Sequence, residues 1–151
     1  MSFATIYKIP KKGYIIHSDR KTISGFRIAF EPFIKVPEDF DNPDDIVNSI
    51  IAGLNYDDLI RLPDPQNFNV LQKNYLSSIG LKSLGELHRP LVKNVSIKKE
   101  NEKIIFTPSK HAKKPEKGFL YKGKDEAVTV LASDRNSKIL EALKIAFAKC
   151  E

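Results

Sequence analysis

The stretch GFRIAFEPFIKVP, residues 25–37, decides the fold class. Its first part, residues 26–30, alternates large apolar side chains with other residues, which is the period of a half-buried β-strand. Pro32 cannot donate a hydrogen bond in a central ladder, so it indicates an edge or a bend and separates off a second short strand, residues 33–36. The stretch contains no nucleophile, no pair of metal ligands and no phosphate-binding loop, which favours binding over catalysis.

The segments on either side of this stretch extend the pattern. Residues 5–9 and 14–18 read as two strands of a hairpin, joined by a turn in which Gly13 can take a positive φ. After the stretch, Asn42 is suited to cap a helix with Pro43 at its first position. The apolar stripe of this helix is Ile46, Val47, Ile50, Ile51 and Leu54.

Further helices are predicted by the same signals. Asp64 as the cap and Pro65 as the first residue open a second helix that ends at Gly80. Its expected inward side chains are Phe68, Leu71, Tyr75, Leu76 and Ile79. Ser83 and Glu86 have the spacing of a capping box, which predicts a short third helix. Ser133 or Asp134 is expected to cap a final helix, whose buried face is Ile139, Leu140, Leu143, Ala146 and Phe147.

The remaining apolar segments predict strands. They lie at residues 91–98, 103–107, 119–121 and 127–131, and the first two form a hairpin. Runs of strands followed by helices favour an α+β fold. We therefore expect residues 1–151 to form a single domain with a mostly antiparallel sheet of about seven or eight strands and three or four helices.

Composition narrows the class of protein. The 151 residues fit one domain, and no apolar run approaches the roughly 20 residues that span a bilayer. The N-terminus lacks the charged start and apolar run of a signal peptide, and the single Cys150 can form no internal disulfide. We expect a cytoplasmic protein.

Charge is unevenly distributed along the chain. The formal net charge is +6, yet residues 31–64 carry two basic and nine acidic side chains, whereas residues 91–124 carry ten basic and three acidic side chains. Such segregation can steer a charged partner, although charge runs are most often solvated surface.

Candidates for catalysis are weak. His17, His88 and His111 show no metal-binding spacing, and no glycine-rich phosphate loop is present, so we expect no cofactor and no metal. The paired carboxylates Asp44–Asp45 and Asp57–Asp58 fit a helix N-terminus and a docking surface better than acid–base chemistry. We expect a protein that is not an enzyme.

Several short segments together resemble the immunity proteins of contact-dependent growth inhibition. The resemblance is carried by Ile6–Lys12, Gly25–Phe26, Glu31–Val36 and Ile139–Leu143. It implies a bacterial protein that binds and neutralises the C-terminal toxin domain of a large surface effector. The toxin is expected to be a nuclease, and neutralisation is expected to work by stoichiometric occlusion of its active site, with no catalytic residue on the inhibitor.

The acidic segment is the predicted docking surface, because it would complement a basic nuclease cleft. The predicted toxin-binding residues are Glu38, Asp39, Asp41, Asp44, Asp45, Tyr56, Asp57 and Asp58. Two alternatives stay open at this point. One is a small nucleic-acid-binding protein that uses the lysines of residues 91–124, and the other is an enzyme built on the three histidines.

Overall fold

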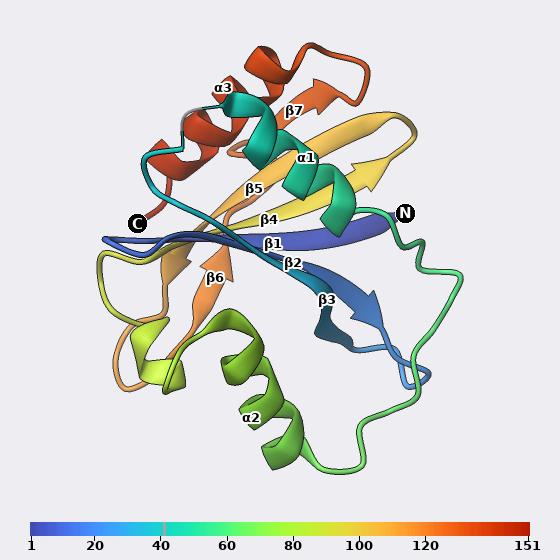
Figure 1. Ribbon diagram of the computed structural model, residues 1–151, viewed down its shortest axis with the longest axis vertical. Helices are drawn as coiled ribbons and strands as arrows, with labels where there is room; N and C mark the ends of the chain where they lie inside the picture. The colour runs from blue at the N-terminus through green and yellow to red at the C-terminus, as the bar shows by residue number, and fades with distance from the viewer. Residues whose placement is uncertain (41) are drawn as a thin grey trace.

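A seven-stranded antiparallel sheet organises the computed structural model, which describes residues 1–40 and 42–151 (Figure 1). The strands are ordered β3-β2-β1-β4-β5-β6, and β7 pairs with β5 beside β6. Their bounds are β1 Ser2–Ile9, β2 Gly13–Lys21, β3 Arg27–Val36, β4 Lys93–Glu100, β5 Lys103–His111, β6 Phe119–Tyr121 and β7 Val128–Leu131. The α+β class and the antiparallel sheet predicted from the sequence are confirmed.

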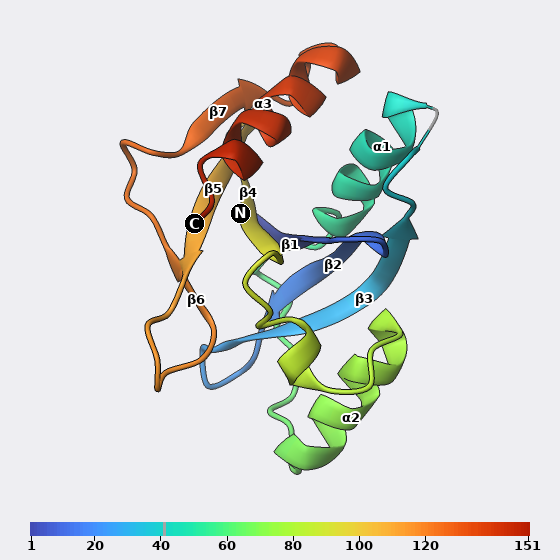
Figure 2. The ribbon, with the colours of Figure 1, turned by 90° about the vertical axis from the view of Figure 1, so that its left-hand side faces the viewer.

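The helices divide between the two faces of this sheet. α1 (Pro43–Gly53) and α3 (Asn136–Ala148) cover one face, and α2 (Phe68–Ile79), with the 3₁₀ turn Leu84–Glu86, lies on the other (Figure 2). None of the helices in the described part of the chain is long and apolar enough to cross a membrane.

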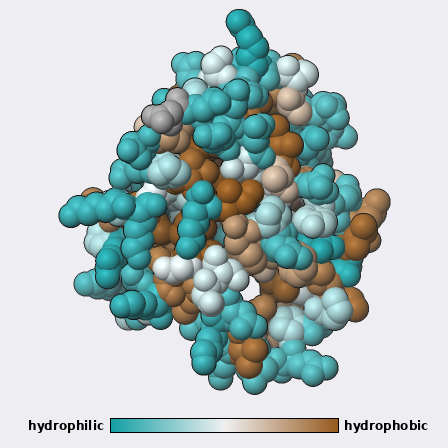
Figure 3. Space-filling model, viewed as in Figure 1, coloured by the Kyte–Doolittle hydropathy of each residue, from teal (hydrophilic) through white to brown (hydrophobic). Residues whose placement is uncertain are grey.

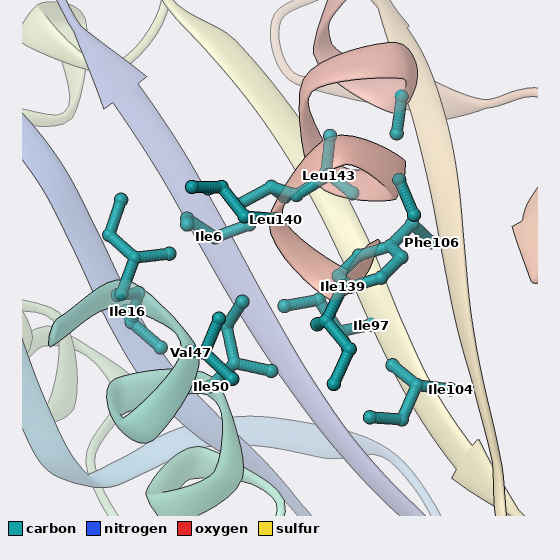
Figure 4. Close-up of a cluster of buried hydrophobic side chains, with 14 of the residues drawn as sticks. Ile6, Ile16, Val47, Ile50, Ile97, Ile104, Phe106, Ile139, Leu140 and Leu143 are labelled. Atoms are coloured by element: carbon teal, nitrogen blue, oxygen red, sulfur yellow. The ribbon is translucent and has the colours of Figure 1, made fainter. Parts of the chain in front are cut away.

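The main core lies between the sheet and the helices α1 and α3 (Figure 4). Ala4 and Ile6 of β1 point to this face, whereas Thr5 and Tyr7 point to the face of α2, because side chains alternate along a strand. Phe106 is fully buried in this core. The largest of its other buried side chains are Ile6, Ile16, Ile46, Ile50, Ile97, Ile104, Ile139 and Leu143.

Strand β3 differs from the prediction of two short strands. It runs unbroken through residues 27–36 and absorbs Glu31 and Pro32 as a bulge, because His17 pairs with Phe33 while Ser18 already pairs with Phe30. The Glu31–Pro32 peptide bond is cis. The edge position predicted from Pro32 is confirmed, since β3 ends the sheet.

Helix α1 begins as predicted. The side chain of Asn42 accepts a hydrogen bond from the backbone N–H of Asp44 at 2.9 Å, and Pro43 is the first helical residue. Four of the five predicted stripe residues are buried, whereas Ile51 is half exposed.

Helix α2 begins three residues later than predicted. Asn67 is the cap, and its side chain accepts hydrogen bonds from the N–H groups of Asn69 and Val70 at 3.0 and 3.2 Å. Asp64 instead accepts the N–H of Ser24 at 3.0 Å, a tertiary contact that ties the α1–α2 connection to the β2–β3 turn. Phe68 therefore lies in the first turn and is 61% exposed, so its predicted inward placement is wrong.

Helix α3 also starts differently. Its N-terminal boundary is Arg135, without a side-chain cap, while the carboxylate of Asp134 accepts the N–H of Leu131 at 2.8 Å and closes the preceding turn. The predicted buried face of this helix is confirmed.

Candidate functional site

The sheet face beneath α2 changes character along its length. Near the β1–β2 turn it is apolar, with Ile9 and Ile15 packed against Ile79, Leu81 and Leu87. Farther along, the register pairs Thr5 with His17 and Phe3 with Asp19, so polar side chains replace apolar ones on the same face. Helix α2 closes over the apolar part and leaves the polar part open as a cleft.

This cleft has a volume of about 430 Å³. Strands β1, β2, β3 and β6, helix α2 and the 3₁₀ turn all contribute to its wall. Its lining residues are Thr5, Tyr7, His17, Asp19, Ile28, Ala29, Phe68, Leu71, Gln72, Tyr75, Leu84 and Tyr121. We refer to it below as the tyrosine cleft, after Tyr7, Tyr75 and Tyr121.

A hydrogen-bond network fixes the polar floor of the tyrosine cleft. Nδ1 of the buried His17 lies 3.1 Å from the carbonyl oxygen of Ser18, and a carbonyl can only accept, so Nδ1 carries the proton. In the neutral ring, Nε2 then accepts a hydrogen bond from the hydroxyl of Tyr75 at 3.1 Å. This bond joins helix α2 to strand β2, and Tyr7 of β1 lines the same cleft.

Two further hydrogen bonds hold Asp19 and Tyr121. The hydroxyl of Thr5 donates a short hydrogen bond to the carboxylate of Asp19. The hydroxyl of Tyr121 donates to the side-chain oxygen of the buried Asn94 at 2.9 Å. Every partner comes from a strand or a helix, so the geometry of this floor is rigid.

The tyrosines of the cleft are neutral at physiological pH. Burial raises the pKa of Tyr7, Tyr75 and Tyr121 above the usual value, and the negative charge of Asp19 raises each of them further. Their hydroxyl groups are therefore polar but uncharged. Asp19 is the one carboxylate on the lining, and no lysine or arginine is among the lining residues that the structure describes.

Exposed aromatic side chains stand at the mouth of the tyrosine cleft. Phe26, 38% exposed, lies with its ring centroid 6.0 Å from that of Phe68. Ile23 in the adjacent β2–β3 turn and Ile60 in the α1–α2 connection are also largely exposed. Figure 3 shows apolar side chains reaching the surface over this connection, at the right-hand margin of the view. An exposed aromatic pair beside a cleft, such as Phe26 and Phe68, is typical of interaction surfaces.

The predicted acidic surface is divided by the fold. Asp44 and Asp45 lie in the first turn of α1, and Glu38 precedes it, where its carboxylate accepts the N–H of Lys11 at 3.1 Å. Asp57 and Asp58 follow the other end of the helix, about 16 Å away for its 11 residues. Asp39 lies with the first group, and Asp41 lies outside the described residues.

The second acidic group is engaged inside the molecule. The carboxylate of Asp57 accepts from the N-terminal amine at 3.1 Å, and that of Asp58 accepts two hydrogen bonds from Arg27, both at 2.7 Å. Hydrogen bonding, chiefly from Arg27, lowers the pKa of Asp58. The ring of Tyr56 lies 4.5 Å from the guanidinium of Arg20. The docking role of this acidic set stays a prediction.

The histidines and lysines are also distributed by the fold. His17 belongs to the tyrosine cleft, whereas His88 and His111 flank Phe119 at a second cleft of about 970 Å³, which Arg89 also lines. Burial, and then the charges of His111 and Lys117, lower the pKa of His88.

The lysines of residues 91–124 do not share one surface. Lys98 and Lys99 are neighbours in β4, so their side chains leave opposite faces of the sheet. Lys98 pairs with Glu100 at 3.0 Å and Lys122 with Glu151 at 3.1 Å. The described residues include no group of three or more His, Cys, Asp or Glu that could hold a metal ion.

Sequence reasoning missed the tyrosine cleft. A signal was present, because Thr5 and Tyr7 are two residues apart in one strand, and His17 and Asp19 are two residues apart in the next. That period places them on one face. The partners from α2 and β6 could not be assigned to this face before the topology was known.

Comparisons with known proteins identify the fold. The structure matches a solved protein of unknown function, NMB0488 from Neisseria meningitidis, with a TM-score of 0.71 and 16% sequence identity over 99% of this chain and 95% of the other. It also matches a chain of the CdiA-CT/CdiI toxin and immunity complex from Yersinia pseudotuberculosis, with a TM-score of 0.71 and 14% identity over 99% of this chain and 97% of that one. No protein-family profile matches the sequence. No curated protein matches it either.

Proposed function

We propose that this chain is an immunity protein that binds and neutralises the toxin domain of a contact-dependent growth inhibition effector. The observation that carries the proposal is the fold, which is shared over nearly the full length of both chains with a chain from a toxin and immunity complex. The resemblance of residues 6–12, 25–26, 31–36 and 139–143 to immunity proteins supports the same conclusion from the sequence. In this role the protein acts in the bacterial cytoplasm.

Neutralisation works by stoichiometric binding in this proposal. The chain covers the active site of the toxin, which we take to be a nuclease, and carries out no reaction itself. Protein inhibitors of this kind obtain association rate from complementary charge and a long lifetime from a few buried anchors. The tyrosine cleft has polar groups on strands and a helix and an aromatic pair at its edge. These features suit a cleft that buries an anchor side chain at the interface.

The docking surface could be the predicted acidic surface or the tyrosine cleft, and charge-reversal variants distinguish between the two. Reversing Asp44 and Asp45 to lysine tests the predicted acidic surface, because both residues are exposed and lie away from the tyrosine cleft. If that surface docks on the toxin, reversal slows association at least about tenfold and the effect fades at high salt. Unchanged association would exclude it as the docking surface.

The proposal is tested by co-expression in bacteria. The chain is produced together with the toxin domain encoded by the gene immediately upstream of its own, and growth is recorded against cells that make the toxin domain alone. Restored growth and co-purification of the two proteins support the proposal. The proposal would be contradicted if growth stayed arrested in cells that contain the folded chain and the two proteins did not co-purify.

A second candidate function rests on the cleft beside Phe119. Its lining combines Arg89, Lys114 and Lys117 with two histidines, and basic and aromatic groups together favour single-stranded nucleic acid. A labelled RNA should then be retarded in a gel at physiological ionic strength, with affinity falling steeply as salt rises. Absence of a shift at micromolar protein would remove this alternative.

A further inference from the structure

The carboxylate of Asp19 is partly buried and lacks a lysine or arginine partner among the described residues. Its side chain is 19% exposed, and its neighbours are the hydroxyl of Thr5 and the ring of His17, whose Nδ1 lies 3.5 Å away. No lysine or arginine of the described chain pairs with it, although three comparably buried carboxylates, those of Asp58, Glu86 and Asp134, have such partners. A partly buried carboxylate without a cation is costly, and a cation brought from outside would relieve that cost.

The groups around Asp19 are also those that a cation prefers. The side chains of Tyr7, Tyr75 and Tyr121 line the same cleft as the carboxylate of Asp19. A phenolic oxygen accepts hydrogen bonds, and an aromatic ring attracts a cation at its face. The lining brings one negative charge, several acceptors and no competing ammonium or guanidinium group.

The walls of the cleft suit an aliphatic chain. Ile28, Leu71 and Leu84 line it together with the polar side chains, and the exposed ring of Phe68 also contributes to the wall. A group with a cationic end and an apolar stem matches this combination of surfaces, as the side chains of lysine and arginine do. A divalent metal ion does not match it, because hard cations need several oxygen ligands with more than one carboxylate or carbonyl.

We propose that the tyrosine cleft receives a lysine or arginine side chain of the partner protein, with its charged end at Asp19 and its stem along Leu71. We infer a protein side chain rather than a free small amine from the residues at the mouth of the cleft. Phe26 and Phe68 expose apolar rings there, and a small amine would leave these rings uncovered. The identity of the partner rests on the proposed function, whereas the chemistry of the cleft does not.

The first experiment tests the chemistry alone. N-acetyl-L-arginine amide and N-acetyl-L-lysine amide are titrated into the ¹⁵N-labelled protein, with N-acetyl-L-citrulline amide as an uncharged control of nearly the same shape. We expect saturable shifts at the amides of Tyr7, Asp19 and Tyr75 with the cationic probes and none with citrulline. Equal shifts with all three probes, or shifts scattered over the surface, would overturn the inference.

Two variants assign the effect to the cleft. Asp19→Asn keeps the hydrogen bond from Thr5 and removes the charge, so we expect affinity for the arginine probe to fall about tenfold or more. Tyr121→Phe removes one acceptor at a half-exposed position and should weaken binding several-fold even if Asp19→Asn fails to fold. The matched control Glu141→Gln removes an exposed carboxylate from α3, on the opposite side of the sheet, and should change nothing.

The second experiment uses the toxin domain from the neighbouring gene. If the unmodified chain binds it and Asp19→Asn weakens binding tenfold or more while Glu141→Gln does not, the inference is supported. If both variants bind as tightly as the unmodified chain, the inference fails while the proposed function stands. If the arginine probe binds but the toxin domain does not, the proposed function fails and the commitment to a toxin side chain fails with it.

Discussion

Removing the hydroxyl of Tyr75 tests the structure of the cleft most sharply. In Tyr75→Phe the ring keeps its packing, but Nε2 of His17 loses its partner at 3.1 Å. His17 is only 3% exposed, so the nitrogen that stays behind is largely cut off from water. The lost hydrogen bond contributes about 1 kcal/mol, and leaving a buried acceptor unpaired costs about 1–3 kcal/mol.

We expect a total loss of about 2 kcal/mol in the free energy of unfolding, because the open cleft lets some water reach the site. For a chain of this size, that corresponds to a fall in Tm of about 4–8 °C. The measurement is urea denaturation followed by circular dichroism, together with a thermal scan. The slope of the urea transition should not change, since the variant alters no buried area.

The control is Tyr56→Phe, which removes a tyrosine hydroxyl from a partly exposed ring stacked beside Arg20. It should change stability by less than about 0.5 kcal/mol. If Tyr75→Phe were as stable as the unmodified protein while Tyr56→Phe behaved as expected, the network that we place at the floor of the cleft would be refuted.

Three further predictions concern the scaffold. Phe106→Ala, at a fully buried position, should lower stability by about 3–5 kcal/mol in denaturant titration, and a loss below about 1 kcal/mol would contradict its central place in the core. Asn67→Ala should cost about 1 kcal/mol because it removes the cap of α2, and a neutral result would place the start of the helix elsewhere. The pKa of Asp58 is lowered in the folded state, so its pairing with Arg27 stabilises the protein above about pH 4, and that contribution disappears as the pH falls through the folded pKa. Asp58→Asn should therefore flatten the dependence of stability on pH below about pH 4, and an unchanged acid limb would be inconsistent with the ion pair.

Local signals predicted the parts of the fold that local physics controls. Asn42 and Pro43 specify the start of α1 by themselves, because capping needs only the first turn of the helix. The apolar stripes predicted nearly all of the residues that α1 and α3 place in the core. The 3.6-residue period of a helix can be recognised from residues that are close in sequence.

The errors arose where tertiary contacts decide. Asp64 and Pro65 have the features of a helix start, but Asp64 bonds to Ser24, 40 residues away, and Asn67 takes the cap. The Glu31–Pro32 bend is absorbed as a bulge because β2 supplies the pairing on both sides of it.

The partners that complete the candidate site could not be assigned from the sequence, and the reason is the same. The hydrogen bond between His17 and Tyr75 joins residues 58 positions apart, and that between Asn94 and Tyr121 joins residues 27 apart. The acidic segment was visible as a charge run, but the pairing of Asp58 with Arg27 and of Asp57 with the N-terminus was not. Charge can be counted along a sequence, whereas its partners depend on the fold.

If this chain neutralises a toxin by binding it, as we propose, a single titration will show both the binding and the loss of toxin activity. The purified chain is added by calorimetry to the toxin domain encoded beside its gene, and the toxin activity that remains is measured at each point. We expect a 1:1 complex of nanomolar or tighter affinity, with toxin activity falling to zero at equivalence. Toxin activity that persists in the presence of excess folded chain, with no heat of binding, would contradict it.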